Sequence, residues 1–319
     1  ITFVEENRLV TIRTIAAKAG VSTSTASRAL NDNPRISSKT RQRVKQIARE
    51  LGYRPNFPAR NLSRGEANII GVVFPIPDAK TTQPANPFHI EIMWGIGKAI
   101  RRKNYEMMVA MGTNQADLVR QVEAMAQQAK VHKFVLLYSQ KDDPVVDYLR
   151  QHQLSYVIVG HPYNALDRFV DNDNVAVGEA ATQRLCTLHK LHQPVFIQST
   201  TDHSFENDRR KGYEQAMQSK SLQPMVVKLS PQDDLMKWLA SHPAVDGLVF
   251  ADDVIYLRYA RQLKETELPV ACFNNSQWIK VVFSDQSVID LQPQKLGAEA
   301  VKLLFNPRHH HIYVPYQVS

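Results

Sequence analysis

Short apolar runs, spaced regularly along the chain after residue 66, constrain the fold more than any other feature. They occupy residues 69–74, 107–111, 134–138, 156–160, 195–197, 225–229, 247–250 and 269–273. Stretches with helical periodicity lie between them, for instance at residues 90–104, 117–129, 173–185 and 293–305. Continuous apolar strands that alternate with helices are typical of parallel sheets covered on both faces. So many strands predict two doubly wound subdomains, with a ligand cleft outside the carboxyl ends of the strands.

The positive charge of the chain is concentrated in its first 65 residues. The whole chain carries a formal charge of +8, whereas residues 1–65 alone hold 13 Lys and Arg against 4 Asp and Glu, which gives +9. Positive charge gathered in one small segment is typical of a protein that binds a polyanion. We therefore expect a nucleic acid as the partner of this segment, with an anionic membrane surface as the second choice.

The same segment has the pattern of a small helical domain. Residues 11–20, TIRTIAAKAG, place apolar side chains on one helix face and end at a glycine that suits a left-handed helix stop. Residues 22–30, STSTASRAL, begin with a serine that can cap a second helix. Residues 37–52 repeat the pattern with a capping serine, an apolar stripe and a final glycine. The spacing predicts a helix-turn-helix domain over residues 10–54.

These residues also resemble a known family. TIRTIAAKAGVSTSTASRALN, residues 11–31, resembles the DNA-binding segment of the lactose/galactose repressor (LacI/GalR) family. The continuation to residue 65 is similar to the same family's third helix, LGYxPN elbow and hinge. The resemblance implies a transcription regulator, a repressor that binds a pseudo-palindromic operator in double-stranded DNA as a homodimer.

The resemblance assigns DNA contacts by position. Thr23, Ser24 and Arg28 fall where the family reads base edges in the major groove, and an arginine fork suits guanine. A second group falls where the family contacts phosphates, which fix register without reading sequence. This group comprises Thr11, Ser22, Thr25, Asn31, Ser37 and Tyr53.

Residues 55–66 form the expected hinge helix. Asn56 can cap it, Pro58 suits its first turn and Gly65 ends it. Because isolated helices shorter than about 12–15 residues are marginal, we expect it to be ordered only with DNA and a second subunit. The resemblance places Ala59, Arg60 and Leu62 in the minor groove, where the leucine wedges into a base step. The alternative is that Leu62 is an ordinary apolar residue of a linker.

Residues 67–319 are the expected effector-sensing and dimerisation domain, with chain crossings between its subdomains near residues 165 and 285. This region resembles the periplasmic sugar-binding-protein fold, which the family uses as its sensor. The resemblance gives the effector candidates Phe88, His161, Asp171, Arg209, Asp252 and Asn274. For Arg209 the alternative is a surface arginine near a helix N-terminus. Asn274 stands where the family generally has aspartate, which keeps a polar contact but removes a charge and leaves the effector open.

Three further segments, NPFHIEIM, VDNDNVAVGEA and CFNNS, are most similar to the maltose-operon repressors of Gram-positive bacteria. They point to a sugar effector of the maltose type. The residues leave two alternatives open. One is a catabolite-control regulator modulated by a phosphorylated partner protein, and the other is a sugar receptor without a role on DNA.

Other features argue for a binding protein rather than an enzyme. The chain has no recognisable catalytic motif, so we expect no catalytic residues, cofactor or metal. We expect residues 309–311, three histidines, to lie in a solvated loop, His189 and His192 to be surface residues or histidines satisfied within the fold, and Cys186 and Cys272 to be buried thiols. No run of 18 apolar residues occurs and the first residues lack a signal pattern, so we expect a cytoplasmic protein without membrane contact.

Overall fold

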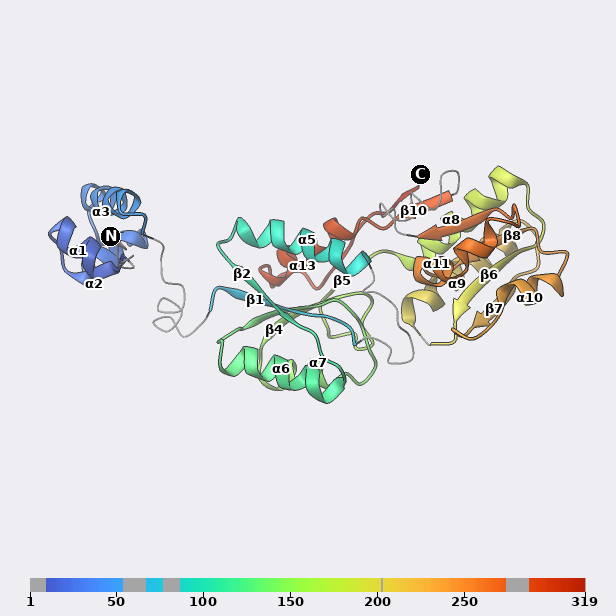
Figure 1. Ribbon diagram of the computed structural model, residues 1–319, viewed down its shortest axis with the longest axis horizontal. Coiled ribbons are helices and arrows are strands. Elements are labelled where there is room, and N and C mark those ends of the chain that lie inside the picture. The colour runs from blue at the N-terminus through green and yellow to red at the C-terminus, as the bar shows by residue number, and fades with distance from the viewer. Residues whose placement is uncertain (1–9, 54–66, 77–86, 202, 274–286, 319) are drawn as a thin grey trace, which may run out of the picture. The chain divides into compact units, whose positions relative to one another are not determined.

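The computed structural model describes residues 10–53, 67–76, 87–201, 203–273 and 287–318. The chain divides into two compact units, residues 1–65 and 66–319. In the described residues the first unit is helical and the second contains two sheets flanked by helices (Figure 1). The predicted fold class is therefore confirmed, whereas the predicted hinge helix at 55–66 lies entirely outside the described residues and stays a prediction.

The described part of the first unit consists of α1 (Ile12–Ala19), α2 (Thr23–Leu30) and α3 (Ser38–Glu50). Each helix begins after a hydroxyl residue whose side chain accepts a hydrogen bond from the backbone N–H three residues later; these caps are Thr11, Ser22 and Ser37. Gly20 ends α1 with φ +60°, a conformation that glycine adopts without steric cost. The helices predicted from the apolar stripes are confirmed.

The core of the first unit is small. Alanines supply much of it, because short side chains let the helices approach closely, and its buried apolar residues are Ile15, Ala16, Ala19, Ala26, Ala29, Val44 and Ala48. Such a core stabilises the unit only modestly, so the caps and polar contacts between helices matter for its stability.

The second unit contains two six-stranded sheets in its described residues. The first sheet has the order β11-β5-β4-β3-β1-β2, with β1 (Ile69–Val73), β2 (Glu106–Ala110), β3 (Lys133–Leu136), β4 (Ser155–Val159), β5 (Phe169–Asp171) and β11 (His311–Tyr313). The second has the order β12-β10-β9-β8-β6-β7, with β6 (Pro194–Ser199), β7 (Met225–Leu229), β8 (Gly247–Phe250), β9 (Val270–Phe273), β10 (Ser287–Asp290) and β12 (Gln317–Val318). Neighbouring strands are parallel, except that β10 and β12 are antiparallel.

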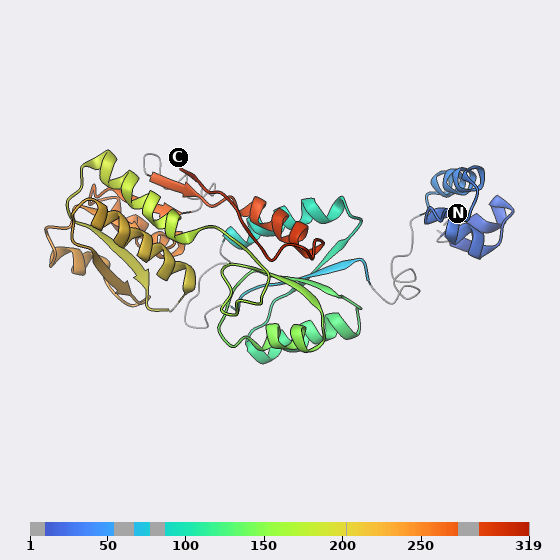
Figure 2. The ribbon, with the colours of Figure 1, turned by 180° about the vertical axis from the view of Figure 1, so that it is seen from behind.

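Helices cover these sheets, as continuous apolar strands require. Those on the first sheet are α5 (Pro87–Arg101), α6 (Gln115–Gln127), α7 (Pro144–Gln151) and α13 (Pro293–Leu304), with α5 and α13 on one face and α6 and α7 on the other (Figure 1). The view from behind also shows α13 beside α5, although they are far apart in sequence (Figure 2). The helices of the second sheet are α8 (Asn174–His189), α9 (Ser204–Ser219), α10 (Leu235–Ala240) and α11 (Asp253–Leu263).

Two helix pairs make unusually close contacts at glycines. A Cβ atom added to Gly178 of α8 would lie 2.1 Å from the carbonyl oxygen of Arg209 in α9. A Cβ atom on Gly95 of α5 would lie 1.9 Å from the carbonyl oxygen of Gln294 in α13. Each sheet therefore has a helix pair whose backbones touch directly.

In the described residues the chain passes between the sheets three times: at residues 172–173 after β5, at 291–292 after β10 and at 314–316 after β11. We call these the crossing segments. The sequence analysis placed two crossings, near residues 165 and 285, and did not foresee the third. The strands that adjoin these crossings are only two to four residues long, so no extended apolar run marks them.

The prediction of a solvated loop at residues 309–311 is partly wrong. His309, His310 and His311 are all exposed as predicted, but His311 begins the edge strand β11 instead of lying in a loop, and its ring stacks on that of Phe169 with centroids 5.3 Å apart. Pairing of β11 with β5 explains this placement, and no local sequence pattern indicates that pairing. His189 and His192 are exposed as predicted, and Cys186 and Cys272 are free, buried thiols.

Candidate DNA-binding surface and effector site

The N-terminus of α2 presents an exposed cluster of hydroxyls. Thr23 and Ser24 form its first two helical positions and Arg28 is exposed one turn later. The Ser22 hydroxyl lies 2.9 Å from the hydroxyl oxygens of both Ser24 and Thr25. Hydroxyls at a helix N-terminus, where backbone N–H groups also point outward, form a surface that suits a phosphate or a base edge. The structure thus brings the predicted base readers together on one exposed face.

The candidates for phosphate contacts have structural roles of their own. Thr11, Ser22 and Ser37 are N-caps, and Asn31 ends α2 with its Nδ2 donating to the carbonyl oxygen of Ser27 at 2.9 Å. Tyr53 is partly buried against the core of the unit. Their contacts with DNA stay predictions, and the hinge candidates Ala59, Arg60 and Leu62 lie outside the described residues.

Part of the positive charge supports the fold of the first unit instead of facing a partner. Arg43 Nη2 in α3 donates to the carbonyl oxygen of Ala19 at 2.6 Å, where α1 ends. Lys45 pairs with Asp32 at 2.5 Å, and this hydrogen bond lowers the pKa of the aspartate. The sequence analysis missed these roles, because the partners are brought together only by the packing of α3 against the turns.

Arg209 is the centre of the candidate effector site. Its side chain lies in α9 and is only 5% exposed, so the alternative of a surface arginine is wrong. Its Nε donates to Asn174 Oδ1 at 3.0 Å and its Nη1 to the carbonyl oxygen of Ala251 at 2.7 Å. The guanidinium carbon lies 4.9 Å from the ring centroid of Phe205 and 4.4 Å from that of Phe273. Two directed hydrogen bonds and two aromatic faces hold this cation in one orientation.

Asp171 is buried at the carboxyl end of β5 and faces the same network. Its carboxylate accepts hydrogen bonds from the Asn172 backbone N–H at 2.8 Å and from Asn174 Nδ2 at 3.1 and 3.2 Å. Burial raises the pKa of Asp171 to about 6, against the opposing effect of these hydrogen bonds and of the Arg209 charge. Asn174 therefore connects two predicted effector residues, although it was not itself predicted. The signal available for it was the run of polar residues, VDNDN, directly after an apolar strand.

The other predicted effector residues lie near this network to different degrees. Asp252 caps α11, and its charge opposes the burial that lowers the pKa of Arg209. His161 is exposed after β4, and its ring centroid lies 5.1 Å from that of Phe169. Phe88 packs against buried clusters of both sheets. Asn274 lies outside the described residues.

Glu206 is a second residue that the sequence analysis missed. It lies in the first turn of α9 and is only 2% exposed. Its Oε2 accepts from the Ser199 backbone N–H and its Oε1 from the Ser199 hydroxyl, both at 2.8 Å. Burial raises the pKa of Glu206 to about 7, and the charge of Asp252 acts in the same direction. The carboxylate fixes the end of β6 to α9, next to the turn that carries Arg209.

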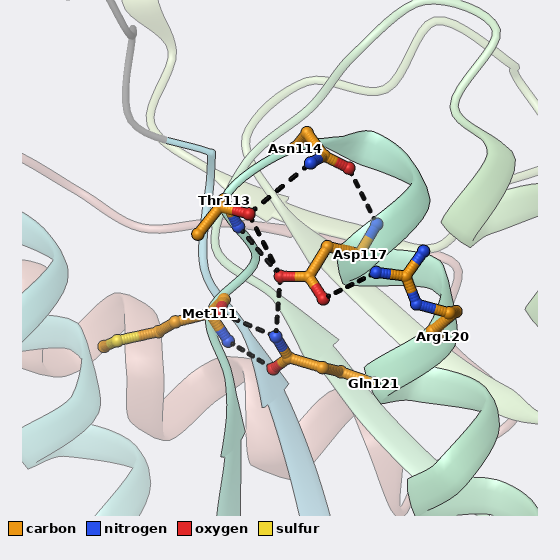
Figure 3. Close-up of polar contacts among 6 residues, drawn as sticks. All are labelled: Met111, Thr113, Asn114, Asp117, Arg120 and Gln121. Atoms are coloured by element: carbon orange, nitrogen blue, oxygen red, sulfur yellow. Dashed lines mark hydrogen bonds and ion pairs between the residues drawn. The ribbon is translucent and has the colours of Figure 1, made fainter.

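A third polar network holds the loop between β2 and α6 (Figure 3). Asp117 accepts hydrogen bonds from the Thr113 backbone N–H at 3.0 Å and from Arg120 Nη2 at 3.1 Å. Gln121 binds both backbone groups of Met111, at 2.8 and 3.1 Å. The network leaves the Met111 side chain 55% exposed. These contacts anchor the loop and need no ligand to explain them.

The described residues contain no group of three His, Cys, Asp or Glu side chains arranged to hold a metal ion. A bilayer is about 30 Å thick in its hydrocarbon core. No helix in the described ranges combines the length and the apolar composition needed to cross it.

A basic helix-turn-helix unit, joined in one chain to two parallel sheets with polar side chains at the strand ends, defines a class of protein: transcription regulators with a small-molecule sensor. Residues 11–56 match the bacterial regulatory proteins of the lacI family. Residues 70–257 match the periplasmic binding proteins and sugar binding domain of the LacI family. The chain belongs to the LacI family, as its resemblance to that family predicted.

Known relatives cover nearly the whole chain. The transcriptional regulator MalR of Staphylococcus xylosus is 30% identical over 311 residues, 93% of this chain and 91% of that protein. The crystal structure of a probable maltose operon transcriptional repressor malR from a Staphylococcus is 22% identical with a TM-score of 0.72, and the match covers 80% of this chain and 96% of that one. The lac repressor dimer bound to operator and an anti-inducer is 18% identical with a TM-score of 0.77, and the match covers 98% of both chains. The last two similarities concern the fold alone.

Proposed function

We propose that this LacI-family transcription regulator represses a carbohydrate operon, binds a pseudo-palindromic operator as a homodimer, and is controlled by a sugar of the maltose type. The observation that carries the proposal is Arg209, a cation only 5% exposed and fixed at the carboxyl ends of the strands of the second sheet. Open parallel sheets bind their ligands at that edge.

The first unit supports the DNA part of the proposal. Residues 1–65 carry a charge of +9, and Thr23, Ser24 and Arg28 are exposed on one helix. Phosphate contacts would supply affinity, and these side chains would supply sequence discrimination. The hinge residues Ala59, Arg60 and Leu62 would enter the minor groove and bend the duplex.

The chemistry of the second unit supports a sugar. A sugar hydroxyl both donates and accepts, so its site needs fixed donors and acceptors together with apolar ring faces. Arg209 carries further N–H groups beyond its bonds to Asn174 and Ala251, Asp171 carries carboxylate acceptors, and Phe88, which is not fully buried, carries apolar surface. The maltose type follows from the sequence segments shared with maltose-operon repressors and from the MalR relatives.

Binding would change operator affinity through the angle between the two sheets. A sugar that prefers one angle shifts the population towards it, and by linkage DNA shifts the sugar affinity by the same factor. This factor is typically about 5–150-fold.

The test begins with selection of a duplex from a random pool by the full-length chain. Affinity for that duplex is then measured at one stated salt concentration with maltose, sucrose, glucose and galactose, because phosphate contacts make the affinity steeply dependent on salt. We expect maltose to change the affinity at least about fivefold. A duplex that is selected but responds to no sugar would refute sugar control and favour the phosphorylated-partner alternative. No selected sequence at all would refute the DNA role.

A second arm tests the hinge. Replacing Leu62 by Ala should weaken duplex binding while the maltose affinity measured without DNA stays the same, since the proposed wedge would contact DNA and not the sugar. Unchanged duplex affinity would mean that Leu62 is an ordinary linker residue.

A further inference from the structure

One buried side chain connects all the crossing segments in the described part of the chain. Asn172 belongs to the first segment and is only 3% exposed. Its Nδ2 donates to the carbonyl oxygen of Leu291 in the second segment at 3.1 Å and to that of Val314, where the third begins, at 2.8 Å. A side-chain amide nitrogen carries two hydrogens, so both are engaged in these bonds. The amide nitrogen of Asn172 is therefore a link between chain segments rather than a donor to an effector.

The same residue is connected to the effector site by hydrogen bonds. The Asn172 backbone N–H donates to the Asp171 carboxylate at 2.8 Å, and Asn174 Nδ2 donates to that carboxylate at 3.1 Å. Asn174 Oδ1 in turn accepts from Arg209 Nε at 3.0 Å. The backbone of Asp171 is also joined to the third segment, because its carbonyl oxygen accepts from the Val314 N–H at 2.8 Å.

Because these hydrogen bonds are buried, the loss of any one of them is costly. A buried carbonyl that loses its donor keeps the cost of desolvation without compensation, so each segment is stabilised in the position that suits the Asn172 amide. A shift of one segment relative to the others breaks at least one of these hydrogen bonds. Concerted movement of all of them keeps every bond.

We infer that Asn172 is a positioning residue that makes the crossing segments move together, so that a ligand held by Arg209 and Asp171 changes the angle between the sheets. The inference rests on the proposed sugar control. It assigns to Asn172 the transmission of the sugar signal, and not the binding of sugar or DNA.

The test uses full-length Asn172→Ala with maltose and the selected duplex. Duplex affinity is measured with and without maltose, and maltose affinity is measured without DNA. We expect the factor by which maltose changes duplex affinity to fall from the roughly 5–150-fold range towards 1. Maltose affinity without DNA should stay within about threefold, since the Asn172 amide nitrogen is fully engaged by the crossing segments. If Asn172→Ala does not fold, Asn172→Thr retains one hydroxyl donor and takes its place, with the same expectation of a reduced factor.

Tyr213→Phe is the matched control. It also removes buried hydrogen bonds, to the backbone of Pro194 and Met225 within the second sheet, but none to a crossing segment. It should lower stability and leave the maltose factor unchanged. An unchanged factor in Asn172→Ala, or an equal fall in Tyr213→Phe, would overturn the inference while leaving sugar control intact. A wild-type chain that responds to no sugar would overturn both.

Discussion

Replacing Glu206 by Gln tests how strongly the buried effector region opposes ionisation. Glutamine has nearly the same shape, and it can keep both contacts with Ser199, since Oε1 accepts from the backbone N–H and Nε2 donates to the hydroxyl. The substitution therefore removes a titratable group with little loss of packing or hydrogen bonding. In the variant, the repulsion between the charges of Asp252 and ionised Glu206 is absent.

The expected magnitude follows from the raised pKa. Burial raises the pKa of Glu206 from 4.5 to about 7, so the folded state binds this proton more tightly than the unfolded state does. The contribution of Glu206 to stability is therefore most favourable at low pH and falls as the pH rises from about 4.5 to about 7. Above pH 7 the full cost of the buried charge, about 3 kcal/mol, is present. The Gln variant lacks this cost and should be more stable by up to about 3 kcal/mol at pH 8.

Urea denaturation followed by tryptophan fluorescence measures this effect. The three tryptophans of the chain, Trp94, Trp238 and Trp278, all belong to residues 66–319, so the signal reports on the second unit. The stability difference between variant and wild type should be small at pH 4.5 and largest at pH 8. Glu214→Gln on the same helix removes a partly exposed ion pair and should change stability by less than about 1 kcal/mol at either pH. A difference that does not grow with pH, or a variant less stable than wild type at pH 8, would refute the reasoning.

Other substitutions probe the two sites and the helix contacts. Arg209→Lys cannot keep both directed hydrogen bonds, so calorimetry should show that maltose binds more weakly by about 1.5–3 kcal/mol. Duplex affinity in the absence of sugar should stay the same. Unaltered maltose binding would show that Arg209 does not belong to the effector site. Arg28→Ala should cost about 1–3 kcal/mol on the selected duplex and relax its sequence at one position, whereas an equal loss on every duplex would indicate a phosphate contact. Gly178→Ala should destabilise the second unit by roughly 1–3 kcal/mol in urea, because the new methyl group meets a carbonyl oxygen. Its control, Gly97→Ala on α5, meets only the Met107 side chain at 3.9 Å and should be neutral or stabilising by up to about 1 kcal/mol.

The sequence predicted the elements whose signal is local. Amphipathic stripes and caps such as Ser22 located the helices of the first unit, and long apolar runs located the central strands. The strands β5, β10, β11 and β12 were not predicted, because they are only two to four residues long and no extended apolar run marks them. The missed crossing at residues 314–316 has the same cause.

The candidate effector site likewise contains residues that the sequence predicted and residues that it did not. Arg209, Asp171 and Asp252 were predicted because they occupy family positions, and the structure places them around one network. Asn172 and Glu206 were missed, because the burial of a polar side chain depends on its partners, and those of Asn172 are 119 and 142 residues away. The local sequence around Asn172 therefore does not show that its side chain is buried and hydrogen-bonded.

The crossing segments have a mechanical consequence for the sensor. A single connection between two rigid bodies would let them rotate about any axis, and the resulting motion would be spread over many directions. Three segments in the described part of the chain are bound to each other through Asn172. By the inference drawn above, such segments would resist twisting and sliding, so that bending about one line would be the softest motion. The helix pairs that touch at glycines stiffen each body. Such an assembly would have few degrees of freedom, so the strain that the proposed sugar produces would be directed into a single movement instead of being spread over many.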